Sequence, residues 1–390
     1  MPQQLAYVII TPYSLHKSRT GGILTRLITR TGCELVAARM FAPNTELVKK
    51  YSEETISAND PQDRRIQELI YDYILRNLSP DPKTGRRRRV MMLLFQGEDA
   101  VRKTRSVVGN IGPERHGGET IRDTYGDLII DENDQLRYFE PAVLASPTPD
   151  EGESKLKLWA HYSETDGGVL QDVIGYQPGE QPQRTLVLIK PENFRFPTGR
   201  PGNMIDFFSR TGLFIVAVKV HRMSVAQAIE FYGPVRETLR TKLKDVVAAK
   251  AKTAIEKELG FKVGREQEQQ LGTILGPSFG DNQFENIVRF MSGRAPSECP
   301  LGEEDKPGSE KCIALVYEGV GAVGKIRDVL GPTDPSKAPP GSIRREFGQT
   351  IMVNAAHASD SVENARREMA IINVGENSFR QMVEQFYGKT

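Results

Sequence analysis

The sequence of 390 residues predicts an α+β protein made of two tandem ferredoxin-like (split βαβ) sandwiches, each an antiparallel sheet covered by helices. Two observations predict this fold class. The chain is similar to itself, since YVIITPYS (7–14) matches LVLIKPEN (186–193), and VVGNIGPERHGGETIRDTYGD (107–127) matches VLGPTDPSKAPPGSIRREFGQ (329–349). Short apolar runs and helical patterns also follow one another in the same order in both copies.

The elements of each copy follow from this periodicity. Short apolar runs are typical of buried strands, and apolar residues at helical spacing indicate helices that pack on them. Strands are predicted in the first copy at 7–10, 35–40, 90–95 and 127–130, and in the second at 186–189, 214–220, 312–317 and 350–353. The helix after the first strand is predicted to end at Gly32 or Gly212, because glycine readily adopts the left-handed conformation at a helix C-terminus. Helices at 100–107 and 322–330 follow the third strands.

The domain organisation follows from the repeat. The first copy is expected to occupy residues 1–165 and the second residues 183–390, and residues 166–182 form the linker. The second copy carries two inserts. Residues 234–280 are rich in Lys, Glu, Ala and Gln and are predicted to be helical, and residues 295–310 are predicted to form a polar surface loop.

Composition restricts the possible partners and locations. Lys plus Arg (52) nearly equals Asp plus Glu (51), so the net charge of +1 gives no general attraction to nucleic acid or to a membrane surface. Three cysteines are too few for a disulfide framework in a chain of this length, which suits a reducing cytoplasm. No membrane contact is expected. The basic run at 86–89 is interpreted as a solvated loop, and contact with nucleic acid is the less supported alternative.

The second copy contains residues suited to phosphoryl transfer. They are Lys190, Arg327, Thr333, Arg344, Asn354, His357, Ser359 and Glu368. Transfer of a phosphoryl group needs cations and hydrogen-bond donors around three charged oxygens, and a nucleophile can carry the group between two substrates. An imidazole is mostly neutral near pH 7 and can act as that nucleophile.

The pattern alone leaves simpler interpretations open. A lone histidine beside apolar residues is more often a structural side chain, and arginines are more often solvated surface charges. Thr333 can start a turn with Pro335, and Lys190 can be an ordinary lysine at a strand end.

Four segments of the second copy resemble the nucleoside diphosphate kinase family. NAAHASDS (354–361) is similar to its active-site signature, with Ala358 where the family usually has glycine. LIKPEN (188–193) is similar to its opening strand and Lys-Pro-Asp, with Glu192 in place of the aspartate. The segments at 318–347 and 361–371 also match, and the four occur in the order of the family.

The resemblance implies a role for each candidate residue. His357 would be phosphorylated by a nucleoside triphosphate such as ATP and discharged onto a nucleoside diphosphate. Glu368, supported by Ser359, would orient the imidazole. The phosphates and the sugar would be held by Lys190, Arg327, Thr333, Arg344 and Asn354, and Mg²⁺ would be bound through the nucleotide phosphates rather than by a metal site of the protein.

Two aromatic residues also match the family. Tyr232 corresponds to the tyrosine near the imidazole, and Phe284 to the aromatic residue that stacks on the base. Stacking on the flat face of a base does not read its hydrogen-bonding edge, so little discrimination between bases is expected. The long insert falls between these two residues, and the effect of this insert on the nucleotide cleft is left open.

The first copy lacks the corresponding chemistry. Thr11 stands in place of the lysine and Ile111 in place of the threonine, and aligning 145–148 with 358–361 places Leu144 at the histidine. Arg105 and Arg122 remain and are interpreted as surface charges, with weak nucleotide binding as the alternative. This copy is predicted to be non-catalytic and to pair with the active copy within the chain, in a protein expected to form a homo-oligomer. The competing hypothesis for the whole chain is a non-catalytic nucleotide-binding or scaffolding protein.

Overall fold

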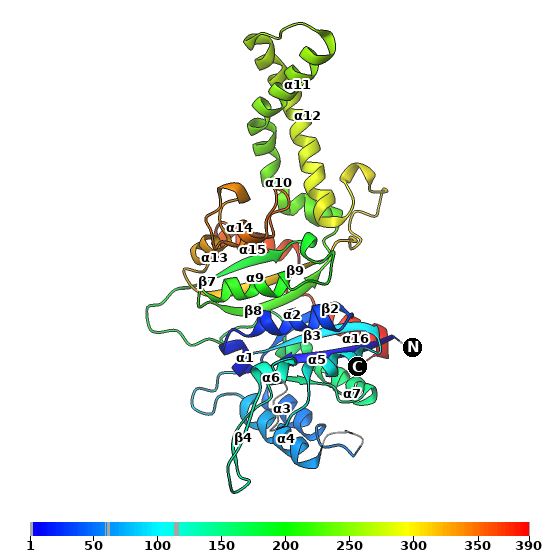
Figure 1. The fold of residues 1–390 in the computed structure, drawn as a ribbon, viewed down its shortest axis with the longest axis vertical. Coiled ribbons are helices and arrows are strands. Elements are labelled where there is room, and N and C mark those ends of the chain that lie inside the picture. Colours follow the sequence, from blue (N-terminus) through cyan, green and yellow to red (C-terminus); the bar gives the residue numbers. More distant parts are fainter. Residues whose placement is uncertain (1–2, 59, 61–62, 113–116, 390) are drawn as a thin grey trace. The chain divides into compact units, whose positions relative to one another are not determined.

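The structure is a computed structural model that describes residues 3–58, 60, 63–112 and 117–389. The chain divides into two compact units, of which one comprises Met1–Val220 with Ile313–Thr390 and the other His221–Cys312. The larger unit contains two four-stranded sheets, and the smaller unit is mainly helical (Figure 1).

The two sheets have the same strand order. The first sheet has the order β2-β3-β1-β6, and the second has the order β10-β7-β9-β8. The strands of the first sheet are β1 (Gln3–Ile10), β2 (Glu34–Phe41), β3 (Val90–Glu98) and β6 (Val143–Ala145), and those of the second are β7 (Pro182–Ile189), β8 (Phe214–His221), β9 (Cys312–Val320) and β10 (Ala356–Ala358). In each sheet the opening strand pairs antiparallel with the third and fourth strands. This confirms the predicted pair of split βαβ sandwiches.

Helices cover these sheets through apolar faces. In the first sandwich they are α1 (Pro12–His16), α2 (Thr20–Arg30), α3 (Thr45–Glu53), α4 (Arg64–Asn77), α5 (Ala100–Val108), α6 (Ile121–Tyr125), α7 (Pro149–His161) and α8 (Ser163–Asp166). In the second they are η1 (Pro191–Asn193), α9 (Arg200–Ser209), α13 (Ala322–Leu330), η3 (Pro335–Lys337), α14 (Ile343–Phe347) and α15 (Val362–Ile371), and the chain ends with α16 (Ser378–Tyr387). Ile23, Leu24 and Leu27 of α2 are buried, as their helical spacing predicts.

The predicted fourth strands do not complete the two sheets. Residues 127–130 form β4 (Asp127–Ile130), which pairs with β5 (Leu136–Glu140) in a separate hairpin, and residues 350–353 form no strand. The strands that complete the two sheets are the short β6 and β10. Three-residue strands are held by pairing with a distant strand, and a local apolar pattern cannot reveal that pairing.

The smaller unit is built around a long helical hairpin. It contains α10 (Val225–Lys242), α11 (Lys244–Leu259) and α12 (Arg265–Ser292), so the helical prediction for 234–280 is confirmed. Figure 1 shows α12 running back beside α11 and α10. A Cβ on Gly280 of α12 would lie 2.6 Å from the backbone of Arg240, so only glycine permits this close approach. Asp281 then accepts hydrogen bonds from Arg236 and Arg240. The loop after the hairpin contains one short 3-10 turn, η2 (Pro296–Glu298).

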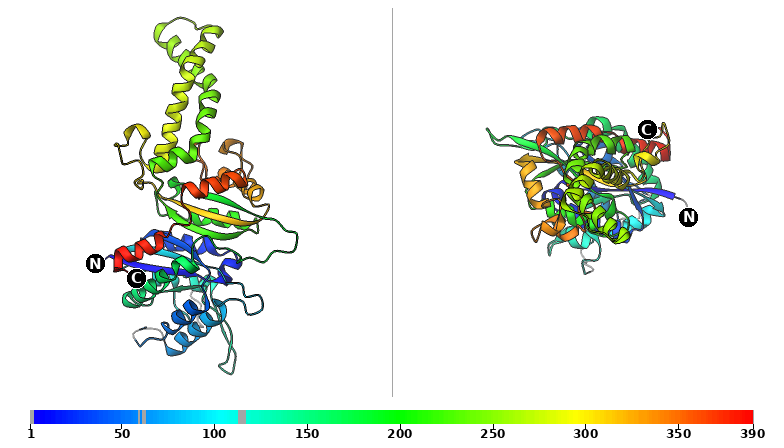
Figure 2. Two further views of the ribbon diagram at one scale, coloured as in Figure 1. Left: turned by 180° about the vertical axis from the view of Figure 1, so that it is seen from behind. Right: turned by 90° about the horizontal axis from the view of Figure 1, so that it is seen from above.

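The C-terminal helix belongs to the core of the first sandwich. Phe379 of α16 is fully buried, and its ring lies 5.5 Å from that of Phe41, which in turn packs edge-on against Trp159. Figure 2 shows α16 beside α7. Although α16 follows residue 183 in the sequence, where the second copy is predicted to begin, its apolar face is buried against the first sheet.

Helices α2 and α9 join the two sandwiches of the larger unit. A Cβ on Gly202 would lie 2.2 Å from the carbonyl oxygen of Gly21, and the hydroxyl of Thr25 donates to the carbonyl of Gly199 at 3.2 Å. Burial raises the pKa of Asp206 on α9 to about 6, although the backbone N–H groups of Gly21 and Gly22 partly offset this rise. The segment predicted as the linker runs along both sheets. The backbone N–H of Gly168 donates to the carbonyl of Met40 on β2, and that of Leu170 donates to the carbonyl of Val216 on β8.

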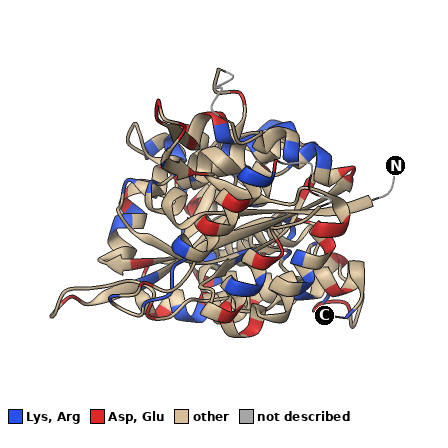
Figure 3. Ribbon diagram, turned by 90° about the horizontal axis from the view of Figure 1, so that it is seen from below, with Lys and Arg blue, Asp and Glu red and all other residues tan. Residues whose placement is uncertain are grey.

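Two arginines of the basic run at 86–89 form polar contacts within the larger unit. Arg87 pairs with the buried Asp166 at 3.0 Å, and Arg89 donates to the carbonyl of Ile215, where burial lowers its pKa to about 10. Basic and acidic residues lie interspersed over the elements drawn in Figure 3. Within the part of the chain that the structure describes, no helix is both long and apolar enough to span a bilayer.

Candidate active site

Strand pairing brings the histidine and the lysine of the second sandwich to one edge of its sheet. His357 lies at the centre of β10 and pairs with Leu188 of β7, and Lys190 directly follows that strand. The backbone N–H of Lys190 donates to the carbonyl of Ala355 at 3.0 Å. Residues far apart in the sequence are thereby fixed side by side by backbone hydrogen bonds.

The imidazole of His357 is held by a carboxylate. Its Nε2 lies 2.9 Å from Oε2 of Glu368 on α15, and the hydroxyl of Ser359 donates to the same oxygen at 2.6 Å. The side chain of His357 is 21% exposed, whereas that of Glu368 is 6% exposed. Because a carboxylate only accepts hydrogen bonds, Nε2 carries the proton in the neutral ring, which leaves a lone pair on Nδ1. The arrangement gives a partly exposed nucleophile with a fixed orientation.

A second chain of hydrogen bonds runs from Lys190 to Thr333. The ammonium of Lys190 donates to Oδ1 of Asn354 at 2.7 Å, and Nδ2 of Asn354 donates to the carbonyl of Thr333 at 3.1 Å. Lys190 is 8% exposed, and burial lowers its pKa to about 8. Glu192 opposes this fall, and the positive charge of Arg344 adds to it.

The two arginines differ in their surroundings. Arg344 on α14 donates to the carbonyl of Gly331 at 2.9 Å and to that of Ala356 at 3.1 Å, next to His357 in the chain. Arg327 lies on the last turn of α13 and is exposed. The guanidinium of Arg344 is thus held by the backbone of the residue before His357, whereas Arg327 is exposed to solvent.

The sequence patterns did not reveal the role of Glu192 and Ala355. Ala355 has a φ of +74°, a left-handed conformation that alanine rarely adopts, and its N–H donates to Oε1 of Glu192 at 2.9 Å. Burial raises the pKa of Glu192, while Lys190 partly offsets the effect. The strained residue lies between Asn354 and His357, so it sets the direction in which both enter the site. The only signal in the sequence was the position of Glu192 after Lys190 and Pro191.

The two predicted aromatic residues belong to the smaller unit. Tyr232 lies on α10 and is 9% exposed, with its ring 4.9 Å from that of Phe231. Phe284 lies on α12 and is 4% exposed, and the guanidinium of Arg236 lies 5.5 Å from the centre of its ring. The structure thus places both residues in the helical hairpin, and their contact with a nucleotide stays a prediction.

The first sandwich has the same backbone frame without the nucleophile. Leu144 of β6 pairs with Ile9 of β1, just as His357 of β10 pairs with Leu188 of β7 in the second sheet. Ala142 also has a positive φ, +60°, and its N–H donates to Glu140. The position of Lys190 is taken by Thr11, whose hydroxyl donates to Glu140 at 3.0 Å. These residues give the first sandwich no group that can carry a phosphoryl group at this position.

The second site combines a nucleophile with neighbouring cations. Lys190 and Arg344 place positive charge near the histidine strand, and Asn354 adds a neutral amide. Such a set suits a ligand that carries several negative oxygens. Over the described residues, no cluster of three or more His, Cys, Asp or Glu side chains that can hold a metal ion occurs.

Comparisons with known proteins show which family this chain is similar to. A family model described as nucleoside diphosphate kinase matches residues 4–164 and 305–376. The nucleoside diphosphate kinase of Campylobacter hominis is 31% identical over 193 residues, which cover 50% of this chain and 96% of that protein. That of Helicobacter pylori is 31% identical over 188 residues, covering 48% of this chain and 93% of the relative. Among solved structures, an NDP kinase from Pyrobaculum aerophilum is 27% identical and covers 49% of this chain and 95% of its own, with a TM-score of 0.34.

Proposed function

This chain belongs to the nucleoside diphosphate kinase family, and from that premise we propose that its second sandwich transfers the terminal phosphoryl group of ATP to a nucleoside diphosphate through His357. The observation that supports this proposal most strongly is the hydrogen bond from the imidazole to Glu368 at 2.9 Å, beside the fixed guanidinium of Arg344. Together they supply an oriented nucleophile and positive charge for a phosphate.

The proposed reaction has two steps. In the first, the lone pair on Nδ1 of His357 attacks the γ-phosphorus, the bond from that phosphorus to the β–γ bridging oxygen breaks, and ADP leaves with the electron pair. In the second, a terminal phosphate oxygen of a nucleoside diphosphate attacks the phosphohistidine, and the N–P electron pair returns to Nδ1. The two half-reactions share one site, which gives a ping-pong route.

The surrounding residues stabilise charge in both steps. Lys190, Arg327 and Arg344 are proposed to balance the negative oxygens, and Asn354 and Thr333 to hold the phosphates and the sugar. The hydrogen bond from Nε2 to Glu368 supports the positive charge that the ring gains when Nδ1 is phosphorylated, and Ser359 keeps the carboxylate in place. Mg²⁺ bound to the nucleotide would neutralise part of the phosphate charge.

The first sandwich is proposed to serve as a structural partner. The packing of α2 on α9 through Gly21 and Gly202 supports a pairing of the two copies within one chain. Such a pairing can take the place of a contact between identical subunits, and association of whole chains into a homo-oligomer is proposed in addition.

A labelling experiment tests the proposed reaction. Purified protein is incubated with radiolabelled ATP and Mg²⁺, and the protein-bound phosphate is tested for stability in acid and in alkali. We expect an acid-labile, alkali-stable label that a nucleoside diphosphate removes. His357→Ala should abolish this label, while His161→Ala, which changes an exposed histidine on α7, should keep it. An unlabelled native chain, or a labelled His357→Ala chain, contradicts the proposal.

A further inference from the structure

The first sandwich contains a cavity where the second has its candidate active site. The cavity is open to solvent, and its empty space is about 460 Å³ with the open part included. Residues that the repeat aligns with the active copy line it, namely Arg105, Arg122 and Leu144. Ile70 and Tyr51 add less polar surface to the same cavity. The proposed function assigns no role to this space.

The guanidinium of Arg122 is held by two backbone carbonyls, like that of Arg344 in the second sandwich. Arg122 donates to the carbonyls of Gly109 at 2.8 Å and Val143 at 3.3 Å. Arg344 donates to the carbonyls of Gly331 and Ala356, which are the aligned positions, at 2.9 and 3.1 Å. The first sandwich has therefore kept the frame that fixes this cation, although Leu144 replaces the nucleophile.

The cavity lacks the histidine and the carboxylate of the active copy, and Thr11 takes the place of Lys190. The alignment that places Leu144 at His357 also places Lys155 of α7 at Glu368, and Lys155 lines the cavity. The nucleophile and its carboxylate have thus been replaced by an apolar side chain and an ammonium. Such a replacement removes transfer chemistry and favours the binding of an anion.

Repulsion between the two arginines adds to this preference. Burial and, to a smaller extent, the nearby charge of Arg105 lower the pKa of Arg122 to about 10, while Asp60 opposes the change. Lys155 pairs with Glu151 at 2.8 Å, and Asp60 is the acidic residue among those that line the cavity. Among the side chains that the structure describes, none forms a hydrogen bond or an ion pair with the guanidinium of Arg105. An anion that enters between the arginines would relieve their mutual repulsion.

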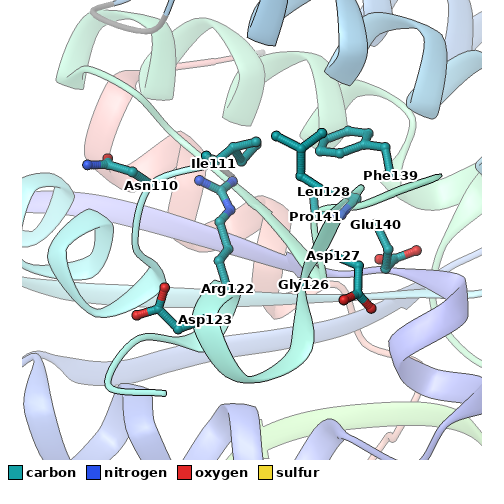
Figure 4. A pocket seen from close by; sticks show the side chains of 11 residues that line it. Asn110, Ile111, Arg122, Asp123, Gly126, Asp127, Leu128, Phe139, Glu140 and Pro141 are labelled. Atoms are coloured by element: carbon teal, nitrogen blue, oxygen red, sulfur yellow. The ribbon is translucent and has the colours of Figure 1, made fainter. Parts of the chain in front are cut away.

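A neighbouring cavity shows which side of Arg122 such an anion would use. This second space, of about 370 Å³, also contacts Arg122, and Figure 4 shows the guanidinium beside Ile111. Ile111 and Pro141 line this space and occupy the positions that align with Thr333 and Asn354 of the second sandwich. The carboxylates of Asp123 and Asp127 line the same space. Carboxylates repel an anion, so the negative part of a ligand is assigned to the side of Arg105 and Lys155.

We propose that the larger cavity binds a nucleoside diphosphate and retains it without phosphoryl transfer. Arg105, Arg122 and Lys155 hold the phosphates, and the less polar wall near Ile70 and Val108 faces the nucleoside. The first sandwich then acts as a nucleotide-binding site that is separate from the kinase site and does not depend on the chemistry of His357.

Equilibrium dialysis of the full chain against labelled ADP with Mg²⁺ tests this proposal. Native protein is expected to bind a second equivalent of ADP beyond the one at the kinase site. Arg105→Gln should weaken this second equivalent by roughly tenfold or more, because a charge-assisted contact with phosphate is lost. Its kinase turnover should equal that of the native chain. Arg102→Gln is the matched control, since Arg102 lies on the same helix and pairs with Asp99 outside the cavity.

The outcomes separate this site from the kinase site. A native chain that binds one equivalent, or an Arg105→Gln chain that binds both unchanged, overturns the proposal. Loss of kinase activity with two equivalents still bound would contradict the proposed function and leave this site standing. Pyrophosphate and orthophosphate serve as competing ligands. If pyrophosphate displaces the second equivalent as well as unlabelled ADP does, the site recognises a diphosphate alone and the nucleoside assignment is wrong.

Discussion

Glu368 lies 2.9 Å from Nε2 of His357 and connects the imidazole to α15, although the two residues sit on different elements. This hydrogen bond fixes which ring nitrogen bears the proton. The same carboxylate oxygen accepts a hydrogen bond from the hydroxyl of Ser359 at 2.6 Å. The orientation of the imidazole therefore depends on both Glu368 and Ser359.

Weakening the hydrogen bonds among Ser359, Glu368 and His357 should slow formation of the phosphohistidine. Glu368→Gln replaces the charged acceptor with a neutral amide and removes the support for the positive ring, so we expect the rate to fall roughly 10- to 100-fold. Ser359→Ala keeps the carboxylate and should cost less, roughly tenfold at most. Rapid mixing with labelled ATP measures the rate directly. A native rate in Glu368→Gln would show that the carboxylate does not orient the ring during the reaction.

Lys190 should give the reaction a pH dependence in the alkaline range. Burial lowers its pKa to about 8, so the ammonium that attracts phosphate is lost as the pH rises through this value. We expect kcat/KM to fall by up to about tenfold per pH unit above that point. Lys190→Met should lack this step and have kcat/KM lower by roughly 100-fold below pH 8. Lys325→Met, which removes an exposed lysine of α13, should keep the native profile. A native profile in Lys190→Met would assign the step to another group.

The same group predicts the direction of a stability change. The pKa of Lys190 in the folded protein is about 8 and its ordinary value is 10.5, so between these values the unfolded chain binds more protons than the folded chain. The free energy of unfolding should therefore increase with pH in this window. Denaturant unfolding of native protein and Lys190→Met at several pH values tests this. The unfolding free energy of the native protein minus that of the variant should increase with pH between about 8 and 10.5. A value that falls with pH in this window would contradict the assignment.

Ala355 and Ala142 provide a matched pair for testing backbone strain. Both have a positive φ, +74° and +60°, and glycine adopts such angles without a steric penalty. Ala355→Gly and Ala142→Gly should each raise the free energy of unfolding by up to about 1 kcal/mol. Only Ala355→Gly should also slow labelling of His357, because that residue sets the direction of the chain into the site. Equal labelling rates in the two variants would show that the strain has no role in positioning.

The close approach of α2 and α9 should make the pairing of the two sandwiches sensitive to one methyl group. In Gly202→Ala the new Cβ would lie 2.2 Å from the carbonyl oxygen of Gly21, so the helices must separate. We expect the free energy of unfolding to fall by about 1–3 kcal/mol. Gly324→Ala is the control, because its Cβ would meet no atom within 4 Å, and helix propensity favours alanine there. Unchanged stability in Gly202→Ala would show that the two helices pack more loosely than the structure indicates.

The sequence by itself determined the repeat, the fold class and the set of candidate residues around His357. These features are local or periodic, and a pattern of apolar residues or a run such as 354–361 records them directly. The loss of the histidine in the first copy was also visible, because it follows from aligning two stretches of the same chain. Residues 127–130 do form a strand, but the sequence did not predict the strands that complete the two sheets, since β6 and β10 are short and depend on pairing with β1 and β7.

Only the tertiary structure decided what surrounds those residues. It placed Glu192 on the N–H of Ala355, buried Lys190, and packed Phe379 of α16 into the first sandwich. It also turned Arg105 and Arg122 from expected surface charges into the lining of a cavity. Each of these results depends on contacts between residues far apart in the chain, and the free energy of such contacts is set by burial and register that a linear pattern does not contain.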